Sequence, residues 1–249
     1  MPPVLSVNVN KVATLRNARG GNVPDVIKCV EYLQNNGAEG ITVHPRPDER
    51  HITRKDVSMI AKIITVEFNI EGYPDQRYLD IIEEVKPAQA TLVPDPPNVL
   101  TSNAGWQIDD TNLKLLAQAV EHIKRQSPQT RISVFINPFD VLEKNLSVLK
   151  NIGVDRIELF TGPYAHTFSS KSSAEIDNVL NIYKTVALHA VEVGLKINAG
   201  HDLDLHNLPK LVSTIPFISE VSIGQAFISD SLWYGFRETL LRYKLALRP

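Results

Sequence analysis

Cysteine is almost missing from this chain, since Cys29 is the single cysteine among its 249 residues. One cysteine excludes an intramolecular disulfide and is typical of a reducing compartment, so we expect a cytoplasmic protein. Cys29 itself is expected to pack as a small apolar residue on the first helix.

Long apolar runs and an excess of charge of either sign are missing too. No segment approaches the roughly 18 apolar residues of a membrane span. The start of the chain, Met-Pro-Pro-Val-Leu-Ser, has neither the basic region nor the apolar run of a signal peptide. With a net charge of -2 and a pI near 6.4, the sequence indicates no membrane and no nucleic-acid partner. The hydrophobic fraction of 43% is ample for a sizeable core.

Apolar, β-branched runs alternate with helical patterns along the whole chain. Eight runs are predicted as strands, at 5–9, 40–44, 64–70, 89–93, 131–136, 156–160, 196–199 and 220–223. Helices are predicted at 24–36, 53–62, 75–85, 112–125, 141–151, 173–193, 208–213 and 231–245. The segment after the first strand, through Gly21, is expected to be a long polar loop, as are residues 94–110, and a further loop follows the sixth strand.

Alternating strands and helices imply a parallel sheet. Eight such units in this length, with no break in composition, predict a (β/α)8 TIM barrel with additional helices, formed as one domain over residues 1–249. A doubly wound open sheet is the alternative. It is less favoured because no Gly-rich dinucleotide-binding turn follows the first strand.

The second predicted strand ends in a dense group of ionisable residues. Pro45 and Pro47 end the strand, because proline donates no ladder hydrogen bond and disfavours helix before it. Within eight positions of that end lie His44, Arg46, Asp48, Glu49, Arg50 and His51. This group is either a solvated surface loop or part of a site.

The barrel prediction favours a site, because active sites of this fold lie at the carboxyl ends of the strands. Residues expected there are Asn8, Asn10, His44, Glu71, Thr101, Glu158, Asn198, His201 and Gly224. Two histidines and two carboxylates on one rim indicate acid–base catalysis, which needs groups that exchange protons near neutral pH.

Phosphate binding is the second expectation. The first loop carries Arg16 and Arg19, and the second carries Arg46 and Arg50. Guanidinium groups match phosphate in a bidentate manner. The eighth strand runs into Ser-Ile-Gly-Gln-Ala before a helix, where a glycine such as Gly224 lets phosphate approach backbone N–H groups.

Five blocks of the sequence together resemble the pyridoxine 5′-phosphate synthase family. They are Asn8-Val-Asn-Lys-Val-Ala-Thr-Leu-Arg-Asn-Ala-Arg-Gly20, Gly40-Ile-Thr-Val-His-Pro-Arg-Pro-Asp-Glu-Arg-His-Ile52, Asn69-Ile-Glu71, Leu92-Val-Pro94 and Asn198-Ala-Gly-His201. The resemblance covers essentially the whole chain, and the first two blocks are the most specific. It implies a (β/α)8 barrel with added helices, assembled as a homo-octamer from dimers.

The resemblance also implies an activity and a site. The expected reaction is a transferase-type, ring-closing condensation of 1-deoxy-D-xylulose 5-phosphate with 3-amino-2-oxopropyl phosphate, without a metal or organic cofactor. The acid–base residues fall on His44, Glu71 and His201. Substrate contacts fall on Asn8, Arg19, Arg46, His51, Thr101, Glu158 and Gly224.

Three departures from the family pattern lie in this site. The family usually has Asp-His where this chain has Asn10-Lys11, Gly where it has Asp202, and His where it has Gln225. We keep these four positions as substrate-binding candidates. A neutral amide at Gln225 makes a weaker phosphate partner, by about 1 kcal/mol, so altered affinity is expected rather than lost activity.

Three other functions stay open from the residues. A Schiff-base aldolase needs a lysine near the reacting carbonyl, but Lys196 stands at the start of the seventh strand. Metal-dependent hydrolysis would need the rim histidines and glutamates to act as ligands. A related protein that binds phosphosugars without turnover is suggested by Asn10, Lys11 and Gln225.

Overall fold

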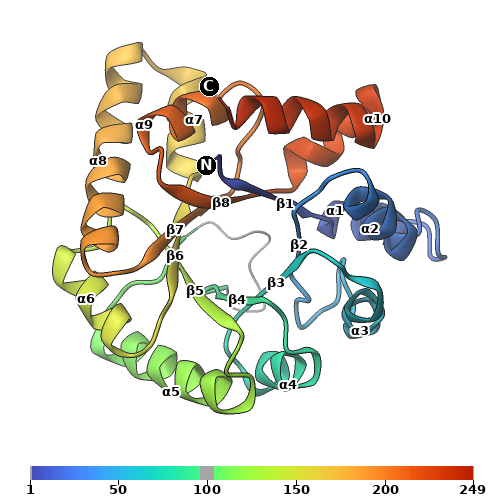
Figure 1. The fold of residues 1–249 in the computed structure, drawn as a ribbon, viewed down its shortest axis with the longest axis horizontal. Coiled ribbons are helices and arrows are strands. Elements are labelled where there is room, and N and C mark those ends of the chain that lie inside the picture. Colours follow the sequence, from blue (N-terminus) through green and yellow to red (C-terminus); the bar gives the residue numbers. More distant parts are fainter. Residues whose placement is uncertain (1, 96–103, 249) are drawn as a thin grey trace.

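The computed structural model describes residues 2–95 and 104–248. Among these residues, parallel strands close into a barrel in sequence order, with β8 paired to β1 (Figure 1). The strands are β1 (Val4–Asn8), β2 (Gly40–Val43), β3 (Glu67–Gly72), β4 (Gln89–Leu92), β5 (Arg131–Ile136), β6 (Arg156–Phe160), β7 (Lys196–Gly200) and β8 (Ile218–Ile223). The prediction of a (β/α)8 barrel is confirmed, and the open-sheet alternative is wrong.

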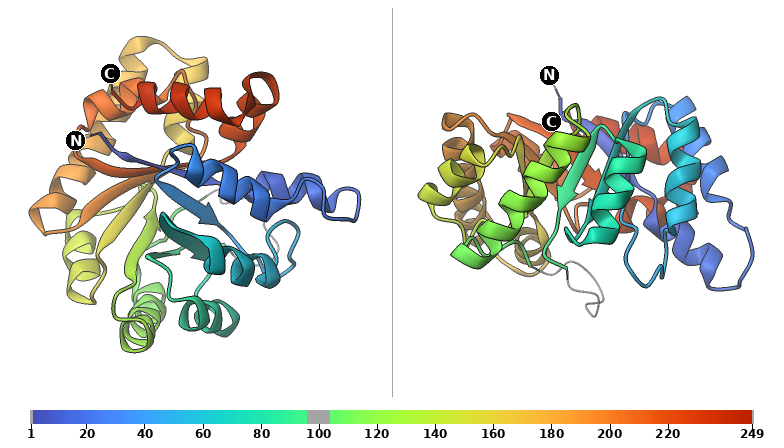
Figure 2. Two further views of the ribbon diagram at one scale, coloured as in Figure 1. Left: turned by 45° about the vertical axis from the view of Figure 1, so that its right-hand side comes forward. Right: turned by 90° about the horizontal axis from the view of Figure 1, so that it is seen from below.

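Helices surround the barrel on its outside (Figure 2). They are α1 (Asn10–Asn17), α2 (Val26–Asn35), α3 (Arg54–Ile63), α4 (Gln76–Val85), α5 (Asp110–Gln126), α6 (Glu143–Asn151), α7 (Gly162–Ser170), α8 (Ser173–Glu192), α9 (Leu208–Thr214) and α10 (Gln225–Ala246). Several begin at a side chain that accepts a hydrogen bond from the first turn, as Asp25, Thr53, Asp75 and Ser172 do. None of the helices described is long and apolar enough to cross a membrane.

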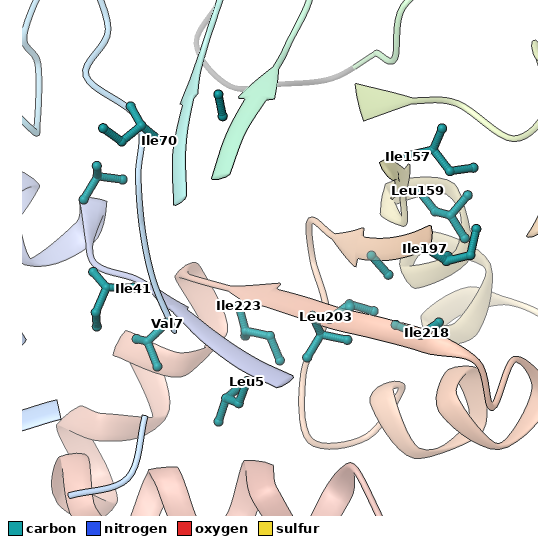
Figure 3. Packing of buried hydrophobic residues seen from close by; sticks show 14 of the residues in the cluster. Leu5, Val7, Ile41, Ile70, Ile157, Leu159, Ile197, Leu203, Ile218 and Ile223 are labelled. Atoms are coloured by element: carbon teal, nitrogen blue, oxygen red, sulfur yellow. The ribbon is translucent and has the colours of Figure 1, made fainter. Parts of the chain in front are cut away.

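The strands place apolar side chains outward and polar ones inward. Val7 is the register partner of Ile41 on one side and Ile223 on the other, and the three lie near one another in Figure 3. Successive strand residues face opposite sides of a sheet. The outward apolar side chains of the strands therefore pack against the helices. Together they form a continuous apolar core between the barrel and the helices.

The barrel interior is hydrogen-bonded and polar, unlike the branched apolar layers usual in this fold. Ser6 and Thr42 hydroxyls lie 2.7 Å apart, and the Asn69 amide donates to Thr42 Oγ1 at 3.3 Å. Thr91 Oγ1 donates to Asn69 Oδ1 at 2.9 Å. Two residues further along β1, β2 and β3, the same inward face reaches the carboxyl rim. Strand periodicity thus places the next inward side chains in the candidate site.

Four predicted segments differ from the structure by three residues or more. The first loop contains α1, and the loop after β6 contains α7. Helix α10 begins at Gln225 rather than at 231, and its path is broken at Gly235, where φ is 74°. The first helix has no side-chain hydrogen bond at its N-cap and buries only Val12, Ala13 and Arg16, so its start signal and apolar pattern are weak. The third strand also begins at Glu67, three residues later than predicted.

Candidate active site

Two strand ends bring His44 and Glu71 together. His44 follows β2 directly, and Glu71 is an inward residue of β3. The Nδ1 atom of His44 lies 4.0 Å from Oε2 of Glu71. The Asn8 amide, at the end of β1, donates to the same carboxylate oxygen at 3.5 Å. Three neighbouring strands therefore supply an imidazole, a carboxyl and an amide to one point on the rim.

Asn10 holds this group in place through the backbone. Its side-chain oxygen accepts the backbone N–H of His44 at 2.9 Å, and its own N–H donates to the Asn8 side-chain oxygen at 3.0 Å. Asparagine supplies the same acceptor oxygen that an aspartate would. The departure from the family pattern at Asn10 therefore leaves this positioning bond available.

Burial sets the protonation states of the pair. Burial, reinforced by the positive charge of nearby His51 and Arg46, lowers the pKa of His44 to about 3. Burial, followed by repulsion from Asp95 and Glu220, raises the pKa of Glu71 to about 8. At pH 7 the site without substrate thus holds a neutral imidazole, able to accept a proton, beside a carboxylic acid able to donate one.

Glu158 adds a second buried carboxyl from β6. Its pKa is raised well above the usual value by burial and then by repulsion from Glu71 and Glu220. Gly200 on β7 makes room for this group, since a Cβ there would lie 2.4 Å from Oε1 of Glu158. The carboxyl of Glu158 therefore packs directly against the backbone of the next strand.

His201 lies across the barrel from Glu71, because β7 is four strands from β3 in the closed ring. Its Nδ1 lies 3.0 Å from Oδ2 of Asp202. The ring meets Phe160 edge to face, with centroids 5.0 Å apart and an interplanar angle of 81°. Two sides of the imidazole are thus occupied by protein groups.

Arg46 and His51 extend the site along the loop after β2. Arg46 is buried and donates to Oδ2 of Asp95 at 3.1 Å. The His51 ring lies 6.3 Å from the His44 ring, centroid to centroid. Burial, followed by the nearby charge of Lys11, lowers the pKa of His51 to about 4. Its Nδ1 accepts the backbone N–H of Ile52 at 2.9 Å, which orients the ring.

Two of the predicted phosphate arginines are engaged elsewhere. Arg16 forms a buried, two-pronged pair with Asp56, at 2.5 and 2.8 Å, and donates to the His51 carbonyl at 3.2 Å. Its expected role in phosphate binding is therefore wrong, and it instead ties α1 to the start of α3. Arg50 pairs with Asp48 on the surface. Arg19 is exposed in the turn after α1.

The end of β8 meets the end of β1. Gly224 is the N-cap of α10, and a Cβ there would lie 3.1 Å from the Cβ of Asn8. Gln225 is the first residue of the helix and is exposed at the rim. Asn198 faces the barrel interior, where it accepts from Arg156 at 3.1 Å. Thr101 lies outside the described residues.

Two buried carboxylates were missed from the sequence. Asp95 follows β4 at the carboxyl rim, so its position after a strand was a usable signal. Glu220 is inward on β8 and pairs with Arg156 at 3.1 Å. The only sequence signal for Glu220 was that a charged residue interrupts the apolar residues of the eighth strand. In the described part of the chain, no group of three or more His, Cys, Asp or Glu side chains is placed to hold a metal ion.

Fold and rim together define a (β/α)8-barrel protein with titratable groups gathered at the carboxyl ends of its strands. Solved structures share the fold: a protein titled KGPDC from Streptococcus mutans has a TM-score of 0.63 at 10% identity, covering 100% of this chain and 98% of that one. A mutant tryptophan synthase alpha-subunit from Pyrococcus furiosus has a TM-score of 0.60 at 10% identity, covering 98% and 95%. These likenesses concern the fold alone.

Sequence relatives are far more similar. Residues 5–249 match the family described as pyridoxal phosphate biosynthesis protein PdxJ, and the chain belongs to that family. It is 50% identical to a pyridoxine 5′-phosphate synthase of Porphyromonas gingivalis, over 96% of this chain and 97% of the relative. It is 47% identical to one of Cytophaga hutchinsonii, over 98% of both.

Proposed function

We propose that this chain is a pyridoxine 5′-phosphate synthase. It condenses 1-deoxy-D-xylulose 5-phosphate with 3-amino-2-oxopropyl phosphate and releases pyridoxine 5′-phosphate, phosphate and water. Family membership and the names of its relatives support this activity. The structural observation that carries it is the buried His44–Glu71 pair, oriented by Asn8 at the carboxyl rim.

The protonation states suggest an order of proton transfers. Joining an amine to a ketone requires removal of a proton from nitrogen and protonation of the departing hydroxyl. His44 is unprotonated and so has the free nitrogen that the first step needs, and the carboxylic acid of Glu71 suits the second. Once it has lost its proton, Glu71 can take one from carbon in a later step.

His201 supplies proton transfer from the far side of the rim in this proposal. A substrate held between β3 and β7 is reached by Glu71 on one face and by His201 on the other. Glu158, whose raised pKa keeps it protonated, donates a hydrogen bond to a substrate oxygen. Several acid–base groups around one pocket suit a sequence of dehydrations and a ring closure. No metal or organic cofactor takes part.

The two phosphates are proposed to bind on separate parts of the rim. One lies near Arg19, Arg46, His51 and Lys11, and the other at the start of α10, where Gly224 and Gln225 present backbone N–H groups. Arg46 is already paired with Asp95, so an incoming phosphate competes for or shares its guanidinium. Thr101 and the backbone of Asp202 complete the proposed substrate contacts.

Assembly into a homo-octamer is part of the proposal. Helix α10 leaves Trp233 exposed to 82% and Leu232 to 71%, around its break at Gly235. Burying these side chains against another copy removes apolar surface from water. Light scattering of the wild type should give eight chains, and Trp233→Glu should give a smaller species. An unchanged mass for Trp233→Glu would place the contact elsewhere.

The single cysteine supports a cytoplasmic location.

Incubation with both substrates tests the activity. The product is detected by mass spectrometry and the released phosphate by a colorimetric assay. The rival is a relative that binds phosphosugars without turnover, and it predicts binding of each substrate with no product. His44→Ala should abolish most of the product while leaving the melting temperature close to that of the wild type.

A further inference from the structure

The turn after β7 has a strained backbone. His201 has a φ of 86° and Asp202 a φ of 56°, so two consecutive residues with side chains occupy the left-handed region. Aspartate enters this region more readily than most residues, but glycine does so at the least cost. A side chain kept at position 202 in this conformation points to a use for its carboxylate.

Neighbouring elements hold this turn in place. The Thr161 hydroxyl, after β6, lies within hydrogen-bonding distance of both the Gly200 carbonyl at 2.7 Å and the His201 carbonyl at 2.5 Å. The Asn207 amide donates to the Asp202 carbonyl at 3.0 Å. The backbone of both residues is therefore fixed from two sides.

The carboxylate of Asp202 faces the imidazole at close range. Its Oδ2 lies 3.0 Å from Nδ1 of His201, while the ring packs on Phe160. A hydrogen bond from His201 is the main cause that holds the pKa of Asp202 below its usual range. The Asp202 side chain is 54% exposed and that of His201 only 21%. The carboxylate is thus ionised at neutral pH and is oriented toward one ring nitrogen.

We propose that Asp202 is a positioning residue for His201, whose carboxylate accepts the Nδ1 proton and leaves Nε2 as the atom that exchanges a proton with substrate. The Nδ1 proton stays in place throughout. Nε2 gains one proton from a substrate group and gives it to a departing oxygen, and the carboxylate stabilises the charged ring between the two steps. The inference rests on the proposed catalytic use of His201.

Two variants at position 202 and a matched control test the proposal. Asp202→Asn keeps an acceptor oxygen without the charge, whereas Asp202→Gly removes the acceptor and relaxes the backbone. Asp177→Asn is the control, because its carboxylate pairs with Lys210 on the surface and is exposed to a similar extent, 53%. The measurements are kcat and KM for both substrates, and ¹⁵N NMR of the His201 ring at a pH where it is neutral, with the signals assigned through His201→Gln.

A graded loss is expected. Asp202→Asn should lower kcat about tenfold, the difference between a charged and a neutral hydrogen-bond acceptor, with KM changed by less than about twofold. Asp202→Gly should lower kcat further and shift the ring toward a mixture of tautomers. Asp177→Asn should match the wild type. Wild-type kcat and an unchanged Nδ1–H tautomer in Asp202→Gly would overturn the inference.

Failure of the inference can be told from failure of the proposed function. If His201→Gln loses turnover while Asp202→Gly keeps both turnover and tautomer, His201 is catalytic and Asp202 does not position it. If His201→Gln turns over normally, the proposed role of His201 is wrong, and the positioning of a catalytic group falls with it. If the wild type forms no product, the proposed activity fails, and the NMR comparison alone decides whether Asp202 fixes the ring.

Discussion

Glu71→Gln should stabilise the folded protein at high pH while it removes activity. Burial is the main cause that raises the pKa of Glu71 from 4.5 to about 8, and Asp95 and Glu220 add to it. Between these two values the folded chain holds a proton that the unfolded chain has released. The free energy of unfolding contributed by this group is therefore fully present below pH 4.5 and is lost as pH rises toward 8. Glutamine has the same shape and carries no such dependence.

The size of the effect follows from the same pKa. One pKa unit corresponds to about 1.4 kcal/mol, so a shift of this size gives an upper limit near 5 kcal/mol. Because other buried carboxyls, Glu158 and Glu220, lie close enough to interact with Glu71, we expect about 2–4 kcal/mol. Relative to the wild type, Glu71→Gln should gain this amount between about pH 4.5 and 9. Its turnover should nevertheless fall by about 10²-fold or more, as for loss of a general acid.

Urea unfolding at pH 5, 7 and 9 measures the difference, with Glu238→Gln as the control. Glu238 is an exposed residue of α10 that pairs with Arg242 at 2.8 Å, so its replacement should change stability by less than about 1 kcal/mol at each pH. A stability difference for Glu71→Gln that stays flat or shrinks as pH rises would show that Glu71 is not a desolvated carboxyl.

Three further predictions concern the surroundings of this pair. Asn10→Asp should keep near-wild-type turnover because an acceptor for the His44 backbone N–H remains. Asn10→Leu should lose most of its kcat and about 1–3 kcal/mol of stability, as measured by urea unfolding. Equal behaviour of the two variants would contradict this role of Asn10. Gly200→Ala should displace the Glu158 carboxyl and lower stability by about 1–3 kcal/mol in the same assay, and a fully stable, active variant would refute the packing argument. Gln225→His should tighten phosphosugar binding by about tenfold at most, and the gain should shrink above about pH 7 as the histidine loses its charge. Gly224→Val should push on Asn8 and weaken binding. Calorimetry from pH 6 to 8.5 tests both variants, and unchanged binding by Gly224→Val would mean that the phosphate site lies elsewhere.

Local patterns predicted most of the fold. Short apolar segments marked every strand of the barrel, and Thr53 and Ser172 were recognisable helix starts. The first helix was not predicted because its N-cap residue, Val9, accepts no side-chain hydrogen bond and its apolar pattern is weak. A buried pair between Arg16 and Asp56, which are 40 positions apart, instead joins this helix to α3. An interaction at that separation is invisible to any local pattern.

The sequence predicted which residues lie at the candidate site better than it predicted their protonation states. The rule that strand ends converge placed His44 and Glu71 on one rim, and the structure brings them within 4.0 Å. The protonation state of Glu71 depends on burial, on Asp95 from the segment after β4 and on Glu220 from β8. That of His44 depends on burial and on the nearby charges of His51 and Arg46. The contact between His201 and Asp202 depends on a backbone turn in which both residues have a positive φ. Neither position is a glycine, so the sequence contained no signal for this turn.

Single-turnover product formation by the wild type, His44→Ala, Glu71→Gln and His201→Ala tests the central claim most directly. With both phosphosubstrates present, the wild type should release one phosphate for each pyridoxine 5′-phosphate formed. Each variant should bind the substrates and melt near or above the wild-type temperature, yet form product about 10²-fold more slowly or worse. Substrate binding without product in the wild type, or near-wild-type rates in two of the three variants, would contradict the account.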